Sequence, residues 1–381
     1  MKIVYFTHSL ASCWNHGNAH FLRGVLDELG RRGHSVQAWE PEGNWSLENL
    51  LDDHGPKGLE PFRASYPELQ PGFYRADADL AELVDGADLV IVHEWNEPEL
   101  VARLGRMRAA GAGWRLLFHD THHRAVSAPE EMCAYDLDGY DGVLAFGEAL
   151  SEVYRRWGWG GRVWTWHEAA DVRRFRPPTA AEEQVRRGLV WIGNWGDGER
   201  TAELEAFLFR PSRASALSLT VHGVRYPPEA LGLLARYGVD YRGWAPNAAA
   251  PGIFARYLAT VHVPRRFYAT TLPGIPTIRV FEALACGIPL ASAPWDDAEG
   301  LFTPGTDYLI AEDGEAMSRH LFALKHDADL RSALSGHGLA TIRARHTCAH
   351  RVDELLTVFD QIGGAPAAQF RPPLEPAGVS R

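Results

Sequence analysis

The chain alternates short apolar runs with helical patterns, and this alternation restricts the folds that it can adopt. In the first half, helical patterns near 18–33, 97–111 and 148–157 separate the apolar runs, and residues 42–76 are irregular, with loops and one helix expected. Strands that alternate with helices predict a parallel sheet with helices on both faces. The expected strands are KIVYF (2–6), HSVQAWE (34–40), ADLVIVH (87–93), WRLLFHD (114–120), DGVLAFG (141–147) and RVWTW (162–166).

A charged stretch with a proline pair, EAADVRRFRPPTAAEE (168–183), interrupts this series. Its composition is typical of an interdomain linker. We therefore expect a first domain over residues 1–167 and a linker over 168–187.

A second alternating series follows the linker and predicts a second domain over residues 188–345. Its helices are expected near 199–208, 228–236, 251–257 and 277–286. Its strands are expected at GLVWIGN (188–194), LSLTVHG (217–223), VDYRGW (239–244), LATVHVP (258–264), IPLASA (288–293) and DYLIA (307–311). A final helix over 346–362 could pack back toward the first domain, and 363–381 reads as a disordered tail.

The predicted fold class is α/β, with two doubly wound, Rossmann-like domains that face each other across a cleft. Ligands of doubly wound sheets bind at the carboxyl ends of the strands. The active site is therefore expected in the cleft between the two domains. At this level of detail, a sugar transferase and a two-domain dehydrogenase are both possible.

Charge and motif content exclude several classes of protein. The net charge of -11 argues against nucleic acid or an anionic membrane as the main partner. No apolar run approaches the ~20 residues of a transmembrane helix. The four cysteines form no CxxC pair, which favours a reducing cytoplasm. The sequence has no GxGxxG, GxxxxGK[ST] or HExxH motif, and the adjacent ligands of HDTHH (119–123) rarely converge on one metal ion.

The segment PGIPTIRVFEALACGIPLAS (273–292) predicts a loop, a short helix and a strand, with polar groups at the helix start. Thr277 can cap the helix, whose exposed N–H groups and dipole favour a phosphate. Arg279 adds a bidentate phosphate donor, and Glu282, on the same face, can accept hydrogen bonds from ribose hydroxyls. Together they would hold a nucleoside diphosphate. A capped core helix with an Arg–Glu surface pair is the alternative.

Four segments carry a resemblance to a known family. RVFEALACGIPLAS (279–292) resembles the donor-site segment of the GT-B glycosyltransferases of group 1, and is most similar to the branch named after spore maturation proteins. GTDYLIAEDGEAM (305–317), RARHTCAHRVDELL (343–356) and THSLASCWNHGNAHFLRGVLDELGRRGHSV (7–36) resemble the same family. The resemblance is good over 188–362, fair over 1–40 and weak over 41–165, as expected if the weak region binds the acceptor.

The resemblance implies a role for each matching residue. It implies that Glu282 binds the donor ribose and that Thr277 and Arg279 lie beside the phosphates. It places Arg265 at the diphosphate, with Arg266 as the alternative. The same comparison gives Arg200 a phosphate contact and Trp244 a place at the nucleobase, although a core or lid tryptophan is an equal alternative.

One position departs from the family pattern. Many retaining enzymes of this fold carry a second glutamate upstream of the ribose acid, separated from it by seven residues, where it contacts the transferred sugar; here that position, 274, is glycine. Backbone N–H groups of the 272–275 loop would then have to bind the sugar. The donor sugar and the stereochemical outcome therefore remain open.

The catalytic groups are expected on the first domain. Gly17 and Asn18 open its first helix, and the matching loop in related enzymes approaches the donor phosphates. His119 and Asp120 end a strand at the rim where a base belongs. If the reaction inverts configuration, Asp120 or His20 is the expected base; if it retains configuration, the leaving phosphate can take the proton.

The expected function is metal-independent transfer of a sugar from a nucleotide-diphosphate sugar, which is the donor substrate, with no cofactor. No DxD segment lies in a likely donor loop, so arginines would stabilise the leaving diphosphate. The acceptor is unidentified and could be a saccharide, a lipid, a protein or a natural product. A nucleotide-sugar epimerase and a noncatalytic nucleotide-sugar-binding protein are the alternatives, and a dehydrogenase is the weakest.

Overall fold

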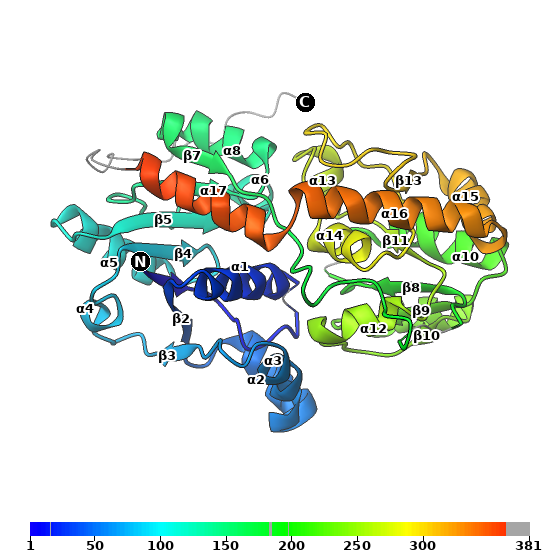
Figure 1. Ribbon diagram of the computed structural model, residues 1–381, viewed down its shortest axis with the longest axis horizontal. Coiled ribbons are helices and arrows are strands. Elements are labelled where there is room, and N and C mark those ends of the chain that lie inside the picture. The colour runs from blue at the N-terminus through cyan, green and yellow to red at the C-terminus, as the bar shows by residue number, and fades with distance from the viewer. Residues whose placement is uncertain (16, 183–184, 197, 363–381) are drawn as a thin grey trace.

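The computed structural model describes residues 1–15, 17–182, 185–196 and 198–362. Two parallel sheets, each covered by helices, form two bodies that lie side by side (Figure 1). The first sheet has seven strands and the second has six. This arrangement confirms the predicted α/β fold class with two doubly wound domains. The expected tail over 363–381 lies outside the described residues.

The first sheet has the strand order β3-β2-β1-β4-β5-β6-β7, and all its neighbouring strands are parallel. Its central strand β4 (Leu89–His93) is buried at every position, because helices cover both faces of the sheet. The other strands are β1 (Lys2–Phe6), β2 (Ser35–Pro41), β3 (Gly72–Tyr74), β5 (Arg115–Asp120), β6 (Gly142–Ala145) and β7 (Val163–Thr165). The main helices are α1 (Ala19–Arg31), α4 (Leu80–Leu83), α5 (Pro98–Ala109), α6 (Arg124–Ser127), α7 (Pro129–Met132) and α8 (Glu148–Tyr154), which continues into the helical turns Arg155–Trp159 and Gly160–Arg162.

The irregular region 42–76 contains more structure than its sequence indicates. It forms α2 (Trp45–His54), a 3-10 helix (Gly55–Leu59), α3 (Glu60–Ser65) and the edge strand β3. The prediction of loops with one helix is therefore wrong for this region. The strand was missed because it has only three residues and no alternation of its own. Its first residue, Gly72, lies under the Trp39 ring, which a Cβ atom would meet at 2.2 Å.

The second sheet has the strand order β10-β9-β8-β11-β12-β13 and is also parallel. Its strands are β8 (Leu189–Ile192), β9 (Leu219–His222), β10 (Asp240–Tyr241), β11 (Ala259–His262), β12 (Leu290–Ser292) and β13 (Leu309–Ile310). Its helices are α9 (Thr201–Leu204), which continues through the turn Glu205–Phe209 into α10 (Arg210–Ala214), α11 (Pro228–Tyr237), the turn Asn247–Ala249, α12 (Ala250–Phe254), α13 (Arg266–Thr270), α14 (Ile278–Ala285), α15 (Gly314–His326) and α16 (Ala328–Arg345).

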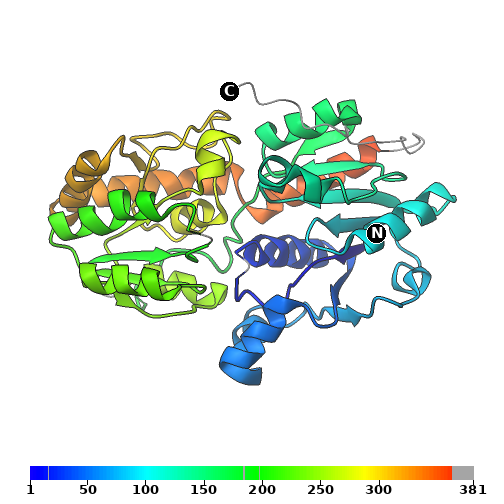
Figure 2. The ribbon, with the colours of Figure 1, turned by 180° about the vertical axis from the view of Figure 1, so that it is seen from behind.

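The last helix, α17 (Cys348–Gln361), leaves the second body and packs on the first, beside α1 (Figures 1 and 2). Trp166 donates its indole N–H to the carbonyl of Arg351 at 2.8 Å. Gly24 of α1 lies so close to Cys348 that a Cβ atom would meet its sulfur at 2.5 Å. The chain therefore links the two bodies twice, through the linker and through this helix. Within the described residues, we find no helix that is both long and apolar enough to cross a membrane.

Candidate active site

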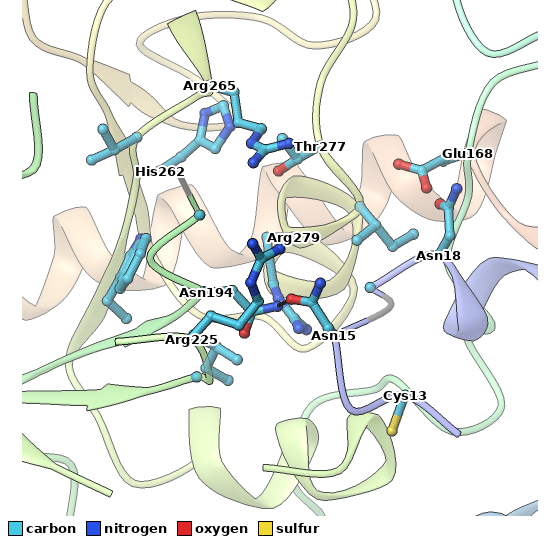
Figure 3. Close-up of a pocket in the computed structure, with 18 of the residues that line it drawn as sticks. Cys13, Asn15, Asn18, Glu168, Asn194, Arg225, His262, Arg265, Thr277 and Arg279 are labelled. Carbon is cyan, nitrogen blue, oxygen red and sulfur yellow. Dashed lines mark hydrogen bonds between the residues drawn. The ribbon is translucent and has the colours of Figure 1, made fainter. Parts of the chain in front are cut away.

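A cavity of about 470 Å³ lies between the two bodies (Figure 3). The first body contributes the loop after β1 and residues that follow β4, β5, β6 and β7. The second body contributes the loops after β8, β9 and β11 and the start of α14. The cavity therefore lies where the carboxyl ends of both sheets meet, the place at which doubly wound sheets bind ligands.

The start of α14 forms part of the cavity wall. Thr277 occupies the N-cap position in an extended conformation, but its side chain makes no capping hydrogen bond. The prediction that its hydroxyl caps the helix is therefore wrong. Thr277 lines the cavity instead, close to Arg265 in Figure 3. Because no side chain caps α14, the positive end of its dipole faces the cavity without a protein anion in the cap position.

Glu282 lies one turn further along α14 and is completely buried. Its Oε1 accepts a hydrogen bond from His20 Nδ1 at 2.9 Å and one from Asn247 Nδ2 at 3.4 Å, and its Oε2 pairs with Arg279. Burial would raise the pKa of Glu282, but Arg279 and then His20 outweigh it and hold the pKa below its usual value. The carboxylate is ionised at neutral pH, and Arg279 stands between it and the cavity.

Two more predicted arginines line the cavity. Arg200 donates to the carbonyls of Asn194 at 2.7 Å and Val263 at 3.0 Å, and burial lowers its pKa to about 10. Arg265 pairs with Glu199 at 2.5 Å and also reaches His123 of the first body at 3.0 Å. Arg200 is therefore still charged at neutral pH, and both guanidinium groups are fixed at the cavity wall by these contacts.

Arg266 does not take part in this wall. It pairs with Glu203 at 3.0 Å, its side chain is 53% exposed, and it does not line the cavity. Of the two neighbouring arginines, the structure therefore brings only Arg265 to the cavity.

The loop after β1 approaches α14 closely. Gly17 packs against Ile278, whose Cγ2 would lie 3.2 Å from an added Cβ atom. Gly17 and Asn18 both line the cavity. Asn15 and Asn194 join the two bodies through a side-chain hydrogen bond of 2.5 Å, drawn in Figure 3. A Cβ atom at position 17 would therefore require Ile278 to shift by a few tenths of an ångström.

Trp244 also lines the cavity. Its indole N–H donates to the carbonyl of Cys13 at 3.4 Å, and its ring lies 4.6 Å from the His54 ring. The ring thus contacts the first body while it borders the cavity.

The three predicted catalytic residues do not line the cavity. His20 uses both ring nitrogens, because Nδ1 contacts Glu282 and Nε2 accepts the N–H of Asp171 at 2.9 Å. Its ring also stacks on Phe175 at 3.6 Å. In this conformation, His20 has no nitrogen left for a substrate and instead connects α1, the linker and α14.

His119 and Asp120 are also completely buried. His119 Nδ1 contacts the Tyr5 hydroxyl at 2.5 Å. Asp120 accepts the N–H of His122 at 3.0 Å and the hydroxyl of Tyr154 at 2.7 Å. Burial, and then the charge of Glu94, raise the pKa of Asp120 to about 7. The strand end thus points these two side chains behind the cavity wall, which Thr121 and His122 form.

The 272–275 loop is partly engaged within the protein. The N–H of Gly274 donates to the carbonyl of Asp296 at 2.7 Å, and Glu299 fills the space where a Cβ atom would lie. The prediction that this loop offers its N–H groups to the sugar is therefore wrong for Gly274. Glu299 instead accepts the N–H of Glu148 at 2.9 Å and pairs with His167 at 2.9 Å.

Sequence reasoning missed several residues that line the cavity. Glu168 appeared only as the first residue of the predicted linker. Arg225 lines the cavity with φ of 60°, a left-handed conformation that is uncommon outside glycine. A ring cluster from separate loops, His8, Trp14, Trp45, Trp95 and His122, lines the first-body side. The tryptophans were visible in the composition, but no local pattern indicated that they would meet.

Within the described part of the chain, no three His, Cys, Asp or Glu side chains form a cluster suited to a metal ion. Positive groups dominate the second-body side of the cavity. Figure 3 shows Arg225, Arg265 and Arg279 around it, with Thr277 between the last two. This arrangement can hold an anion such as a phosphate.

Residues 200–357 match a family model described as glycosyl transferase-like. This range includes α14 and most of the second body. Residues 200–357 are therefore similar to a glycosyl transferase-like domain, and the two sheets together have the GT-B fold. No protein of curated function matches it in sequence.

Solved structures with the same fold cover both bodies. HepE of Anabaena, in complex with UDP and glucose, has a TM-score of 0.66 at 12% identity, with 95% of this chain and 100% of that chain covered. Sucrose-phosphate synthase of Thermosynechococcus elongatus has a TM-score of 0.64 at 13% identity, with 95% and 99% covered. Phage T4 β-glucosyltransferase, in complex with UDP and Mn²⁺, has a TM-score of 0.58 at 13% identity, with 94% and 100% covered.

Proposed function

We propose that this glycosyltransferase transfers a sugar from a nucleoside-diphosphate sugar to an acceptor, without a metal ion. The observation that carries the proposal is the positive side of the cavity, where Arg200, Arg265 and Arg279 surround the uncapped start of α14. Neutral ligands gain little from such a wall, whereas a diphosphate would be bound by charge-assisted hydrogen bonds. The UDP complexes of HepE and of the phage enzyme, which share the fold, support the same class of donor.

The same groups supply the catalytic chemistry. As the bond between the sugar and the diphosphate breaks, negative charge accumulates on the leaving phosphate oxygen. Arg265 is held in place by Glu199 and His123, so it can stabilise that charge without reorganising. Such fixed groups stabilise the transition state more than the ground state. Loss of one donor of this kind typically costs ~3 kcal/mol of activation free energy.

We assign the donor ribose to Glu282 and Arg279 together. Glu282 is ionised but screened from the cavity by Arg279, whose side chain is 26% exposed. When a diphosphate attracts Arg279, Oε2 of Glu282 becomes available to the ribose hydroxyls. The nucleobase would then lie between Trp244 and the loop that carries Arg225.

The acceptor would lie against the ring cluster of the first body. Trp45 and Trp95 are 41% and 37% exposed and belong to the same cavity as the arginines. His8 lies 5.6 Å from the Trp45 ring, and burial, with help from His93, lowers its pKa to about 4. His8 is thus neutral at pH 7 and can accept a hydrogen bond from an acceptor hydroxyl, but a pKa of about 4 makes it a weak base. Asp120, with a pKa of about 7 behind the wall, remains our alternative for the base.

Calorimetric titration with UDP, GDP, dTDP and their sugar derivatives tests the donor site. We expect one nucleotide to bind, and nucleoside diphosphate to be released only when an acceptor is present. Release without any acceptor would indicate hydrolysis, and interconversion of the donor sugar would indicate an epimerase. Binding without turnover against a broad acceptor panel would support a noncatalytic binding protein. Binding of none of the nucleotides would refute the proposal.

Two finer predictions also belong to this proposal. The first is that the chain groups with the branch named after spore maturation proteins. The second is a cytoplasmic location, which is supported by the absence of disulfides among the four cysteines, all of them within the described residues.

A further inference from the structure

One carboxyl group in the cavity differs from every other buried carboxyl near it. Glu168 follows β7 at the start of the linker, is 5% exposed and lines the cavity. Within the described residues, its side chain has no hydrogen-bond partner and no ion pair. By contrast, Glu40 accepts two backbone N–H groups at 2.7 Å, and Glu282 contacts three side chains. A buried carboxyl that lacks a partner is destabilising, so it needs a compensating role.

The position of Glu168 identifies the part of the ligand that it faces. Figure 3 shows its carboxyl next to Asn18, at the edge of the cavity that borders the first body. The charges near Glu168 are mainly negative. After burial, the carboxyl groups of Glu282 and Glu94 raise the pKa of Glu168 further, and only the charge of Arg279 lowers it. A diphosphate would be repelled here. A neutral group that donates O–H hydrogen bonds would satisfy the carboxyl oxygens, and a sugar carries several such hydroxyls.

We infer that Glu168 binds a hydroxyl of the transferred sugar and thereby helps to select the donor. This inference rests on the proposed function and adds to it the residue that holds the sugar. Gly274, the position at which the family pattern has a sugar-binding glutamate, offers no side chain, and its N–H is engaged by Asp296. Glu168 supplies from the linker the hydrogen-bond acceptor that the second body lacks at that position. Burial also raises the pKa of Glu168 well above its usual value, which favours the protonated form.

The test compares the affinities of a nucleotide with and without its sugar. The wild-type protein, Glu168→Gln and Glu168→Ala are each titrated with matched pairs of a nucleotide and its sugar derivative. The pairs are UDP with UDP-glucose, UDP with UDP-N-acetylglucosamine, and GDP with GDP-mannose. For the pair that the wild-type protein binds, we expect the sugar nucleotide to bind about 10- to 100-fold more weakly to Glu168→Ala. The free nucleotide should bind about equally well, because the inferred contact of Glu168 is with the sugar and not with the nucleotide. A smaller loss is expected for Glu168→Gln, which keeps one acceptor oxygen.

Protein stability provides a second readout. Because Glu168 has no internal partner, both variants should melt at the wild-type temperature or above it. The matched control is Glu40→Gln, which alters a buried carboxyl whose oxygens are fully engaged. It should melt at a lower temperature and leave the ratio of the two affinities unchanged.

The possible failures can be distinguished. If the wild-type protein binds no nucleotide, the proposed function itself fails. If it binds a sugar nucleotide and Glu168→Ala keeps the wild-type ratio of affinities, only the inference about Glu168 fails. A fall in melting temperature with an equal loss for nucleotide and sugar nucleotide would indicate a structural role and would also overturn the inference.

Discussion

Replacing Glu282 tests two roles that the structure gives to one side chain. The carboxylate connects α14 to α1 through His20 and holds Arg279 at the cavity, and we also assign it to the donor ribose. Glu282→Ala removes an ionised group that is 0% exposed, together with three hydrogen-bonding contacts. Removing one partner of a buried pair costs about 3–5 kcal/mol.

The expected magnitude lies at the lower end of that range. Arg279 is 26% exposed and can turn to water when its partner is lost, whereas the buried His20 cannot. We therefore expect Glu282→Ala to lower the free energy of unfolding by about 3 kcal/mol. At about 2–4 °C per kcal/mol for domains of this size, the melting temperature should fall by about 6–12 °C. Urea denaturation at pH 7 gives the free energy directly.

The effect on the donor is measured separately. Two lost hydrogen bonds to ribose should weaken nucleotide binding by about 1–3 kcal/mol, which is roughly 5- to 150-fold. Calorimetry is done at a temperature at which the variant is folded. Arg266→Ala serves as the control, because it breaks an exposed ion pair and should change stability by less than about 1 kcal/mol. Wild-type nucleotide affinity in Glu282→Ala would refute the ribose assignment, and wild-type stability would refute the connection through His20.

Four further predictions concern the remaining groups. Arg265→Ala should lower turnover by about 100-fold or more while Arg266→Ala leaves it near the wild-type rate; equal rates in the two variants would remove Arg265 from the mechanism. Because the pKa of Asp120 is raised to about 7, the folded state keeps a proton that the unfolded state loses between about pH 4 and pH 7, and this group lowers stability as pH rises through that window. In urea denaturation, Asp120→Asn should therefore gain stability relative to the wild type from pH 5 to pH 8. A constant difference between the two proteins would contradict the pKa shift. Trp45→Ala should raise the KM for the acceptor with little change in nucleotide affinity, whereas Phe73→Ala, an equally exposed aromatic residue outside the cavity, should change neither. EDTA should leave the transfer rate unchanged, and restoration of a lost rate by Mn²⁺ or Mg²⁺ would show that a metal takes part.

Much of the fold could be predicted from local sequence. Eleven of the expected strands and the helix α14 follow from apolar runs bounded by polar or glycine-rich turns, and β10 is present as a pair of residues. These patterns are reliable because a strand covered on both faces has to be apolar along its length. The edge strand β3 was missed because only three of its residues pair with β2.

The candidate site was predictable only where it depends on one helix. Arg279 and Glu282 share a face of α14 because they are three residues apart, and Thr277 lies at the start of the same helix. Helical spacing alone does not predict that Arg279 covers Glu282. It could not separate Arg265 from Arg266 either, because the choice depends on Glu199 and Glu203 in another loop.

The sequence by itself thus determined two parallel α/β sheets and a phosphate-type helix start, because both follow from periodicity within short segments. Only the tertiary structure decided which side chains reach the cavity. His119 and Asp120 end a strand at the expected edge, yet their side chains point behind the wall, and His20 is enclosed by the linker and α14. Glu168 reaches the cavity from the linker. The direction of each side chain depends on how two bodies from distant parts of the chain pack together, and no local pattern records that packing.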